Sequence, residues 1–425
     1  MSLQDLHFTS ARVQDDGGML QVSATGGQFD RMSIKGDGGG SSYTIKLIDI
    51  LVSSLVDVDV DDSSLLDFSA VGSQCDLLSV SSSHSGGGGG GAGKVSIQDF
   101  HFSSASVRDD GSSFAVTATG GSSDALSIKG ESTARSHIIK LTDVLITGLV
   151  EVDVETADAV TFSAVDSQCA MLSLSSSRAP VAGASSGGGA GKVVFQDMHF
   201  SSVEVHDDGS LMQVHASGGV SSSASFQGDK RSDGVSRFYK VSFEDLTLAG
   251  AVAVDADASL DFSMDTCVTQ GLHIATTDSA RTGKVFQKVE LYRVVSSGAV
   301  DVQAAGGLDL SADSCRSSSV FFKMDTTNSP QPSPPSHVSL TNGRVTGAMT
   351  ILGGAGDNDV TLDSMFISGP AVVALAGGND RLAVLDSIFA KFALFAGGSG
   401  TDELTVQNSK FTVKPFQLDW ETIST

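Results

Sequence analysis

Residues 338–402 divide into three similar units, VSLTNGRVTGAMTILGGAGDN (338–358), DVTLDSMFISGPAVVALAGGND (359–380) and RLAVLDSIFAKFALFAGGSGTD (381–402). Each unit has two short runs of alternating apolar residues and ends in a turn rich in Gly, Asn and Asp. This alternation predicts β-strands, because successive side chains of a strand point to opposite faces. A unit of about 22 residues cannot bury its own apolar face, so neighbouring units must stack. The stretch therefore predicts a solenoid in which each unit is one coil.

A longer repeat covers the first part of the chain. SLQDLHFTSARVQDDGG (2–18) returns as SIQDFHFSSASVRDDGS (96–112) and VFQDMHFSSVEVHDDGS (194–210), and a decayed copy starts near Lys284. We expect residues 1–335 to form a β-solenoid of repeats of roughly 95 residues, each about four coils long (1–93, 94–191, 192–283 and, in part, 284–335). Residues 336–411 are expected to form regular short coils with GG turns, and residues 412–425 a tail that acts as a cap or as an inter-subunit contact.

The fold class that follows is all-β, a parallel β-helix (β-solenoid) of about 18–19 coils of roughly 22 residues. The pattern resembles the right-handed parallel β-helix repeat proteins of bacterial surfaces and phage fibres, and right-handedness is implied by that resemblance alone. Three stretches are interpreted as loops of a continuous solenoid: HSGGGGGGAGK (84–94), RAPVAGASSGGGAGK (178–192) and NSPQPSPPS (328–336). The alternative is that they are flexible linkers between domains.

Charge and composition limit the class of partner. Lys+Arg total 26 against 50 Asp+Glu, a net charge of −24, so nucleic acids and anionic membranes are unfavourable partners. No apolar run reaches the roughly 20 residues of a membrane helix, and MSLQDLHFTS is strand-like rather than a signal peptide. We expect an extracellular or cell-surface location, with a signal-less or processed chain, and leave a cytoplasmic location open.

The four cysteines include no C-x-x-C pair, which argues against a zinc site. Cys75 and Cys169 occupy one repeat position seen twice, since 169 − 75 = 94. We interpret the cysteines as free thiols packed as small apolar groups.

The turn GGSGTDELTV (397–406) is a candidate calcium site. Its Gly397, Gly398, Gly400, Asp402 and Leu404 resemble the nonapeptide of RTX proteins, in which turn carbonyls and carboxylates supply oxygen ligands. The turns at 353, 377 and 397 recur once per coil rather than in tandem, which favours plain turns with Gly at positive φ. The resemblance implies calcium as the one candidate cofactor, with these residues as ligands: Asp357, Asn358, Asp359, Asp380 and Asp402.

Two further patterns invite a chemical interpretation. Asp-x-His occurs three times with a serine following, at Asp5/His7 with Ser10, Asp99/His101 with Ser103 and Asp197/His199 with Ser201. Copies about four coils apart lie too far from one another to cooperate, so they are expected to be strand ladder positions rather than a catalytic triad. Acidic residues alternate in Asp57/Asp59/Asp61, Glu151/Asp153/Glu155 and Asp255/Asp257, which predicts a solvated strand face, with a bound cation as the alternative.

No enzymatic activity is predicted, since no unique cluster of Asp, Arg and Lys stands apart from the repeats. We expect a structural protein that assembles head to tail into a filament or surface layer, with itself as the main partner. The residues expected at that contact are Trp420, Phe416, Leu3 and Phe8. The alternatives are a monomeric adhesin that binds surface glycans and, less favoured, a polysaccharide lyase-type enzyme.

Overall fold

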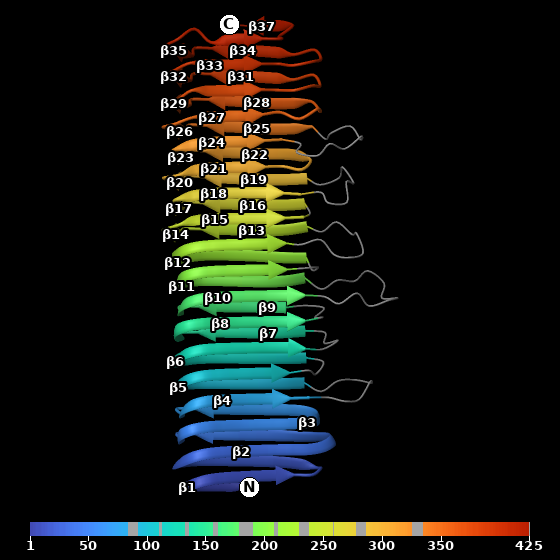
Figure 1. Cartoon of the computed structure of the whole chain (residues 1–425), viewed down its shortest axis with the longest axis vertical. Coiled ribbons are helices and arrows are strands. Elements are labelled where there is room, and N and C mark those ends of the chain that lie inside the picture. The colour runs from blue at the N-terminus through green and yellow to red at the C-terminus, as the bar shows by residue number, and fades with distance from the viewer. Residues whose placement is uncertain are drawn as a thin grey trace. The chain divides into compact units, whose positions relative to one another are not determined.

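The structure is a computed structural model, and it shows an all-β parallel β-solenoid of about 16 coils of roughly 22 residues (Figure 1). This confirms the predicted fold class and comes close to the 18–19 coils expected. The residues described are 1–83, 92–109, 113–131, 136–155, 160–177, 190–207, 211–228, 238–257, 259–277, 286–324 and 335–424. They contain no helix, and hence no helix that could cross a membrane.

Two compact units make up the chain, Met1–Gln213 and Val214–Thr425, here called unit 1 and unit 2. Strand β12 contributes residues to both. The strands of unit 1 are β1 (Ser2–Asp15), β2 (Met19–Ile48), β3 (Leu51–Val71), β4 (Gln74–Ser82), β5 (Ala92–Asp109), β6 (Ser113–Glu131), β7 (Ser136–Thr142), β8 (Leu145–Glu155), β9 (Val160–Val165), β10 (Gln168–Ser177), β11 (Ala190–Asp207) and the start of β12 (Leu211–Gly228).

Unit 2 divides each regular coil into a long strand, a two-residue strand and a strand of intermediate length. Its strands are β13 (Phe238–Glu244), β14 (Thr247–Leu248), β15 (Ala251–Ala256), β16 (Ser259–Asp265), β17 (Val268–Thr269), β18 (Gly271–Thr276), β19 (Phe286–Tyr292), β20 (Val295–Ser296), β21 (Ala299–Gln303), β22 (Gly307–Asp313), β23 (Arg316–Ser317), β24 (Ser319–Lys323), β25 (Ser336–Thr341), β26 (Arg344–Val345), β27 (Met349–Leu352), β28 (Asn358–Asp363), β29 (Phe366–Ile367), β30 (Ala371–Ala374), β31 (Arg381–Leu385), β32 (Ile388–Phe389), β33 (Ala393–Ala396), β34 (Glu403–Gln407), β35 (Lys410–Phe411), β36 (Phe416–Leu418) and β37 (Thr422–Ser424).

Strands of successive coils pair in parallel, and the pairing is in register over long stretches. In unit 2, β28 pairs with β31 so that Val360 lies opposite Leu382, 22 residues further along (382 − 360). In unit 1, Gln168 lies opposite His199, which is 31 residues further along (199 − 168). Coils longer than 22 residues explain why dividing the chain length by 22 overestimates the number of coils.

The core of each unit is built by the alternation that the sequence shows. In β16, Leu260, Phe262 and Met264 are buried and the residues between them are not. Because parallel pairing is in register, each buried residue lies directly between its counterparts in the neighbouring coils, and a slip by one residue would turn this apolar face outward. The core is therefore a set of inward-facing columns that run from coil to coil.

The loop stretches 84–94, 178–192 and 328–336 lie mainly outside the described residues. Strands of successive coils nevertheless pair on either side of them, β4 with β5, β10 with β11 and β22 with β25. Parallel pairing therefore continues past each stretch, as expected for loops of a solenoid. The repeat boundaries proposed from the sequence stay predictions.

All four cysteines are free, and Cys75, Cys169 and Cys267 are buried. Burial raises the pKa of the Cys75 and Cys169 thiols to about 12 and that of the Cys267 and Cys315 thiols to about 11. The thiols are therefore protonated at neutral pH and poor nucleophiles. This agrees with their interpretation as packed apolar groups.

A corner in the left-handed backbone region recurs once per coil. In unit 1, Asp99 (φ 49°) is followed one coil later by Gly120 (φ +65°), and Asp49 by Gly72 in the same way. A Cβ on Gly120 would lie 2.6 Å from Oδ1 of Asp99, so the aspartate side chain occupies the space that glycine leaves free. The glycine is needed here both for its backbone conformation and for the carboxylate packed against it.

We expect Gly120→Ala to lower the free energy of unfolding by about 1–2 kcal/mol, because a Cβ is strained at this φ and meets the Asp99 carboxylate. The measurement is the urea midpoint followed by far-UV circular dichroism. The same substitution in an Asp99→Ala background is the control, since it lacks the carboxylate. An equal loss in both backgrounds would show that the packed carboxylate has no part in the effect.

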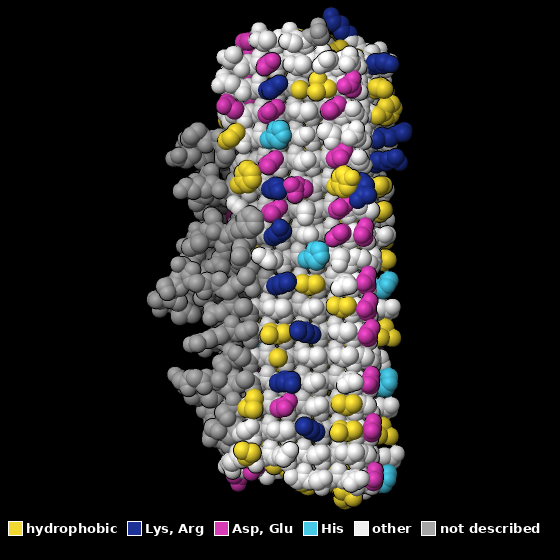
Figure 2. All heavy atoms as spheres, turned by 180° about the vertical axis from the view of Figure 1, so that it is seen from behind, with side chains coloured by type: hydrophobic (Ala, Val, Ile, Leu, Met, Phe, Trp, Pro, Cys, Tyr) yellow, Lys and Arg dark blue, Asp and Glu magenta, His cyan; other side chains and the backbone are white. Residues whose placement is uncertain are grey.

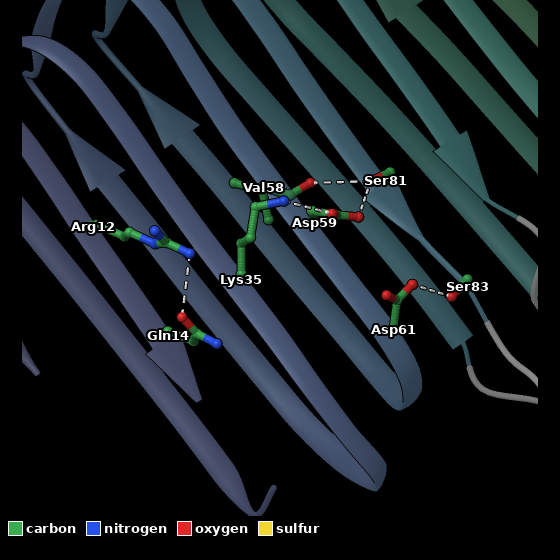
Figure 3. A network of polar contacts seen from close by, with 8 residues as sticks. All are labelled: Arg12, Gln14, Lys35, Val58, Asp59, Asp61, Ser81 and Ser83. Atoms are coloured by element: carbon green, nitrogen blue, oxygen red, sulfur yellow. Dashed lines mark hydrogen bonds and ion pairs between the residues drawn. The ribbon is translucent and has the colours of Figure 1, made fainter. Parts of the chain in front are cut away.

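The predicted acidic face of unit 1 lies on the outside of neighbouring strands (Figure 3). Asp59 accepts hydrogen bonds from Nζ of Lys35 (3.0 Å) and from Oγ of Ser81 (2.7 Å), and Ser83 donates to Asp61. Burial raises the pKa of Asp59, but the hydrogen bonds from Ser81 and Lys35 outweigh it and hold that pKa below its usual range. Asp59 is thus paired with a cation, and both Asp59 and Asp61 accept a hydrogen bond from a serine.

Candidate functional site

One inward-facing column of unit 2 is polar rather than apolar. It consists of Ser336, Asn358, Asp380 and Asp402, which are equivalent residues of four successive coils and are between 1% and 4% exposed. We call these four residues the polar column. Carboxylates are rarely buried to this extent without partners, so the column is the strongest candidate site in the described part of unit 2.

Each acid of the column accepts a hydrogen bond from the backbone of the preceding coil. The amide N–H of Asn358 donates to Oδ1 of Asp380 (2.8 Å), and the amide of Asp380 donates to Oδ1 of Asp402 (2.9 Å). The amide of Asp402 donates in turn to Oε2 of Glu421 (2.7 Å). The column is therefore continuous and ends on a carboxylate of the C-terminal tail.

The side-chain amide of Asn358 shows what the glycine turn requires. Its Nδ2 donates to the carbonyls of Gly354 (3.2 Å) and Gly356 (2.7 Å) and to Oδ1 of Asp380 (2.9 Å). The next two residues of the column, Asp380 and Asp402, carry no such donor when ionised. Among the described residues, Oδ2 of Asp380 and Oδ2 of Asp402 are buried without a hydrogen-bond partner.

Gly397 in the last glycine turn lies against the free Oδ2 of Asp402. A Cβ on Gly397 would lie 2.8 Å from Oδ2 of Asp402, so a larger residue at 397 would fill that space. A carboxylate oxygen facing turn backbone with no donor is satisfied in one of two ways. It takes up a proton and becomes a donor, or it binds a cation.

Protonation of Asp380 is favoured by its surroundings. Burial raises its pKa to about 6, and the charges of Asp402 and Asp357 act in the same direction. The hydrogen bonds donated by Asn358 oppose this effect and leave the pKa still above its usual value. Asp380 is therefore neutral in mildly acidic solution and largely ionised at pH 7.

The residues predicted to bind calcium divide between the inside and the outside of the coil. Asn358, Asp380 and Asp402 lie in the polar column, whereas Asp357 is exposed and its Oδ1 accepts from the amide of Asn379 (2.7 Å). No group of three or more His, Cys, Asp or Glu side chains in the described residues is arranged to hold a metal. The calcium site stays a prediction, and the column could offer an ion at most its Oδ2 atoms and turn carbonyls.

Asp359, the last of the predicted ligands, lies on the outer face of β28. Its Oδ2 is 3.8 Å from Nδ1 of His337 on the neighbouring strand β25. It points away from the polar column, because it follows Asn358 directly and successive strand residues alternate in direction.

The Asp-x-His repeats are placed as ladder positions. Asp99 is a left-handed corner, and the exposed His101 has Nδ1 2.9 Å from Oγ of Ser122 in the next coil. The other two pairs sit at equivalent corners, at Asp5 and Asp197. Each aspartate thus has a backbone role, and the three histidines lie on separate coils.

Sequence reasoning missed a charged cluster on the outer face of unit 2. His273 on β18 lies between two carboxylates, with Nδ1 3.0 Å from Oδ2 of Asp301 and Nε2 3.5 Å from Oδ1 of Asp255. These residues are 18 and 28 positions apart (273 − 255 and 301 − 273), so an even coil length would not align them. The cluster is half-exposed and lies on three neighbouring strands.

The four residues predicted at an inter-subunit contact lie at the first and last coils. Phe8 is 48% exposed and its ring centroid is 6.1 Å from that of Phe29, and Leu3 is half-buried on the same strand. Phe416 is exposed on β36. Trp420 is half-buried and its Nε1–H donates to the carbonyl of Phe395 (3.0 Å), so the indole packs on its own chain.

Comparison of the chain with protein-family models, with curated proteins and with solved structures found no match.

Proposed function

We propose that this chain is a structural β-solenoid protein that associates with itself end to end, as a subunit of an extracellular filament or surface layer. Coil-on-coil stacking already builds each unit, and the same parallel pairing is available between copies. A head-to-tail contact of this kind is heterologous and does not close, so it propagates into a fibre.

The observation that carries the proposal is an exposed phenylalanine on β1 at a position that is buried in the neighbouring coil. Phe8 on β1 pairs with Phe29 on β2, yet Phe8 is 48% exposed and Phe29 only 3%. The two side chains occupy the same position in neighbouring coils, and a coil on the other side of β1 would bury Phe8 as β1 helps to bury Phe29. Burying a phenylalanine is worth roughly 1.5–3 kcal/mol.

The last coil presents a comparable surface. Ile423 on β37 is 47% exposed, whereas its partner Leu404 on β34 is fully buried. Trp420 and Glu421 satisfy backbone groups of the preceding coil but leave Ile423 uncovered. An apolar surface at each of these two coils is what end-to-end association requires.

A structural role is also supported by the arrangement of the reactive side chains. The Asp-x-His repeats lie on separate coils, about four coils apart, and the buried thiols are protonated at neutral pH. A catalytic site instead brings a nucleophile, a base and a charge-stabilising group within hydrogen-bond reach of one another.

The test is negative-stain electron microscopy of the purified chain and of Phe8→Asp, each in calcium and in EDTA. We expect fibres from the unchanged chain in both solutions and single particles from Phe8→Asp, because a buried charge opposes the stacked contact. Leu77→Asp is the matched control, since Leu77 on β4 is 49% exposed but lies away from both end coils. Single particles from the unchanged chain in both solutions would refute the proposal and favour the adhesin alternative. Fibres in calcium alone would keep it and make calcium part of the contact.

A further inference from the structure

A row of basic and apolar side chains follows the short strands of unit 2. The first residue of each short strand from β17 to β32 points outward, and these residues pair in register from coil to coil. The row contains no acid, although the whole chain has nearly twice as many acids as bases. We call it the basic ridge, and its members are Val268, Val295, Arg316, Arg344, Phe366 and Ile388.

Two arginines are stacked directly at the centre of the basic ridge. Arg316 lies opposite Arg344 in the neighbouring coil, at the strand spacing of about 4.8 Å. Like charges placed opposite each other are destabilising. Neither guanidinium forms an ion pair within the described residues, and Arg344 instead lies over the ring of Phe366 at 5.0 Å.

The corner next to the ridge adds a third cation. Arg293 lies two residues before β20 and is exposed. Its one ion pair within the described residues is with Asp265, whose Oδ1 is 3.4 Å from Nη2. The same edge exposes apolar surface, with Val268 47%, Val295 41% and Ile388 41% exposed. Figure 2 shows dark blue and yellow side chains together along the right-hand edge of unit 2 in that view. Unpaired cations beside exposed apolar groups are the composition of a contact surface for an acidic partner.

Unit 1 has an acidic counterpart at its own corners. Asp143, Asp166 and Asp197 are exposed left-handed corners of three consecutive coils, because β7 pairs with β9 and β9 with β11. Leu145, two residues after the first of them, is 45% exposed. The two ridge arginines and these three acids thus recur with the same period, which is the coil spacing of about 4.8 Å. Magenta side chains mark this edge of unit 1 in Figure 2.

We propose that the basic ridge of unit 2 docks side by side onto the acidic corner row (Asp143, Asp166 and Asp197) of unit 1 in a second copy of this chain. Matching periods allow each arginine to meet one carboxylate, and Val295 to pack near Leu145. The contact is lateral and uses none of the end-coil residues, so it rests on the proposed self-association only in taking a second copy as the partner. In a filament it would join neighbouring fibres into a layer.

The test uses Phe8→Asp as the background, so that end-to-end stacking is absent and only lateral association is measured by sedimentation velocity. We expect this protein to dimerise. Arg316→Glu together with Arg344→Glu should raise the dissociation constant about tenfold or more. Lys240→Glu with Lys288→Glu is the matched control: it makes the same change in net charge on the outer face of β13 and β19, away from the ridge.

Rescue distinguishes a specific contact from a general charge effect. Mixing the Arg→Glu protein with a protein that carries Asp143→Lys and Asp166→Lys is expected to restore a heterodimer. A long cation is tolerated at such a corner, as Arg293 at φ 52° shows. The proposal is overturned if the Phe8→Asp protein is monomeric, if the control weakens association equally, or if mixing restores nothing. None of these outcomes affects the end-to-end proposal, which is tested separately by whether the unchanged chain forms fibres.

Discussion

Replacing Asp380 by asparagine is expected to stabilise the protein at pH 7 by about 2–3 kcal/mol in free energy of unfolding. The carboxylate is buried, and its pKa rises from 3.8 to about 6. The folded protein therefore holds a proton that the unfolded chain has lost, between about pH 4 and pH 6. Stability from this group is fully present below pH 3.8 and is lost as the pH rises through 6. Asparagine remains neutral throughout and can donate to the turn, as Asn358 does one coil earlier.

The measurement is urea unfolding of the unchanged protein and of Asp380→Asn at pH 4, 5.5 and 7, with EDTA present. Trp420, the single tryptophan, donates to the carbonyl of Phe395 and so reports on the last coils of unit 2 by its fluorescence. The two proteins should agree at pH 4 and diverge as the pH rises. Asp386→Asn is the control, because Asp386 is an exposed corner of the same unit.

Calcium gives the same experiment a second outcome. If the Oδ2 atoms bind the ion, added calcium will stabilise the unchanged protein at pH 7, since a ligand bound only by the folded state adds to its stability. Asp380→Asn would then lose stability in calcium rather than gain it. A protein that is insensitive to calcium and is stabilised by Asp380→Asn would show that the column takes a proton and no metal.

The position of these carboxylates could have been derived from the sequence. Val360, Leu382 and Leu404 are the inward residues of their strands, so residues two positions earlier must also point inward. Those residues are Asn358, Asp380 and Asp402. The resemblance to calcium turns grouped the five predicted ligands because they are close in sequence. Strand alternation instead places Asp357 and Asp359 on the outside of the coil and the other three on the inside.

The fold was largely predictable because the repeat and the alternation are strong. Stacking and parallel strands follow from patterns that recur in almost every coil. What could not be predicted depends on unequal coil lengths. The spacing from Asp255 to His273 to Asp301 and the pairing of Arg316 with Arg344 are set by how many residues each connection contains, and the pattern of apolar residues does not report this.

Replacing His137 by tyrosine is expected to remove an acid-sensitive point in unit 1. Both ring nitrogens of His137 are buried without a hydrogen-bond partner in the described residues, and burial lowers its pKa to about 4. The unfolded chain therefore binds a proton that the folded chain excludes. Stability is fully present above pH 6.5 and is lost as the pH falls through 4, by up to about 3 kcal/mol.

The repeat itself indicates the substitution. A Cβ on Gly130 would lie 2.7 Å from the ring of His137. A Cβ on Gly36 would likewise lie 2.4 Å from the ring of Tyr43, and a Cβ on Gly228 would lie 2.6 Å from the ring of Tyr239. Position 137 is therefore a site built for a six-membered ring over glycine, filled in this one copy by an imidazole.

We expect His137→Tyr to leave stability at pH 7 equal or slightly higher and to gain about 2–3 kcal/mol at pH 4, because tyrosine does not titrate in this range. Hydrogen exchange of unit 1 between pH 4 and pH 7 measures the effect locally, with rates corrected for the intrinsic pH dependence of exchange. His101→Gln is the control, since His101 is exposed two coils away on an outer strand position. Equal acid sensitivity in the His137→Tyr and unchanged proteins would place the acid-sensitive group elsewhere. Because Asp380 acts in the opposite direction in unit 2, lowering the pH should loosen unit 1 while it tightens the last coils of unit 2, and the two substitutions should remove these responses one at a time.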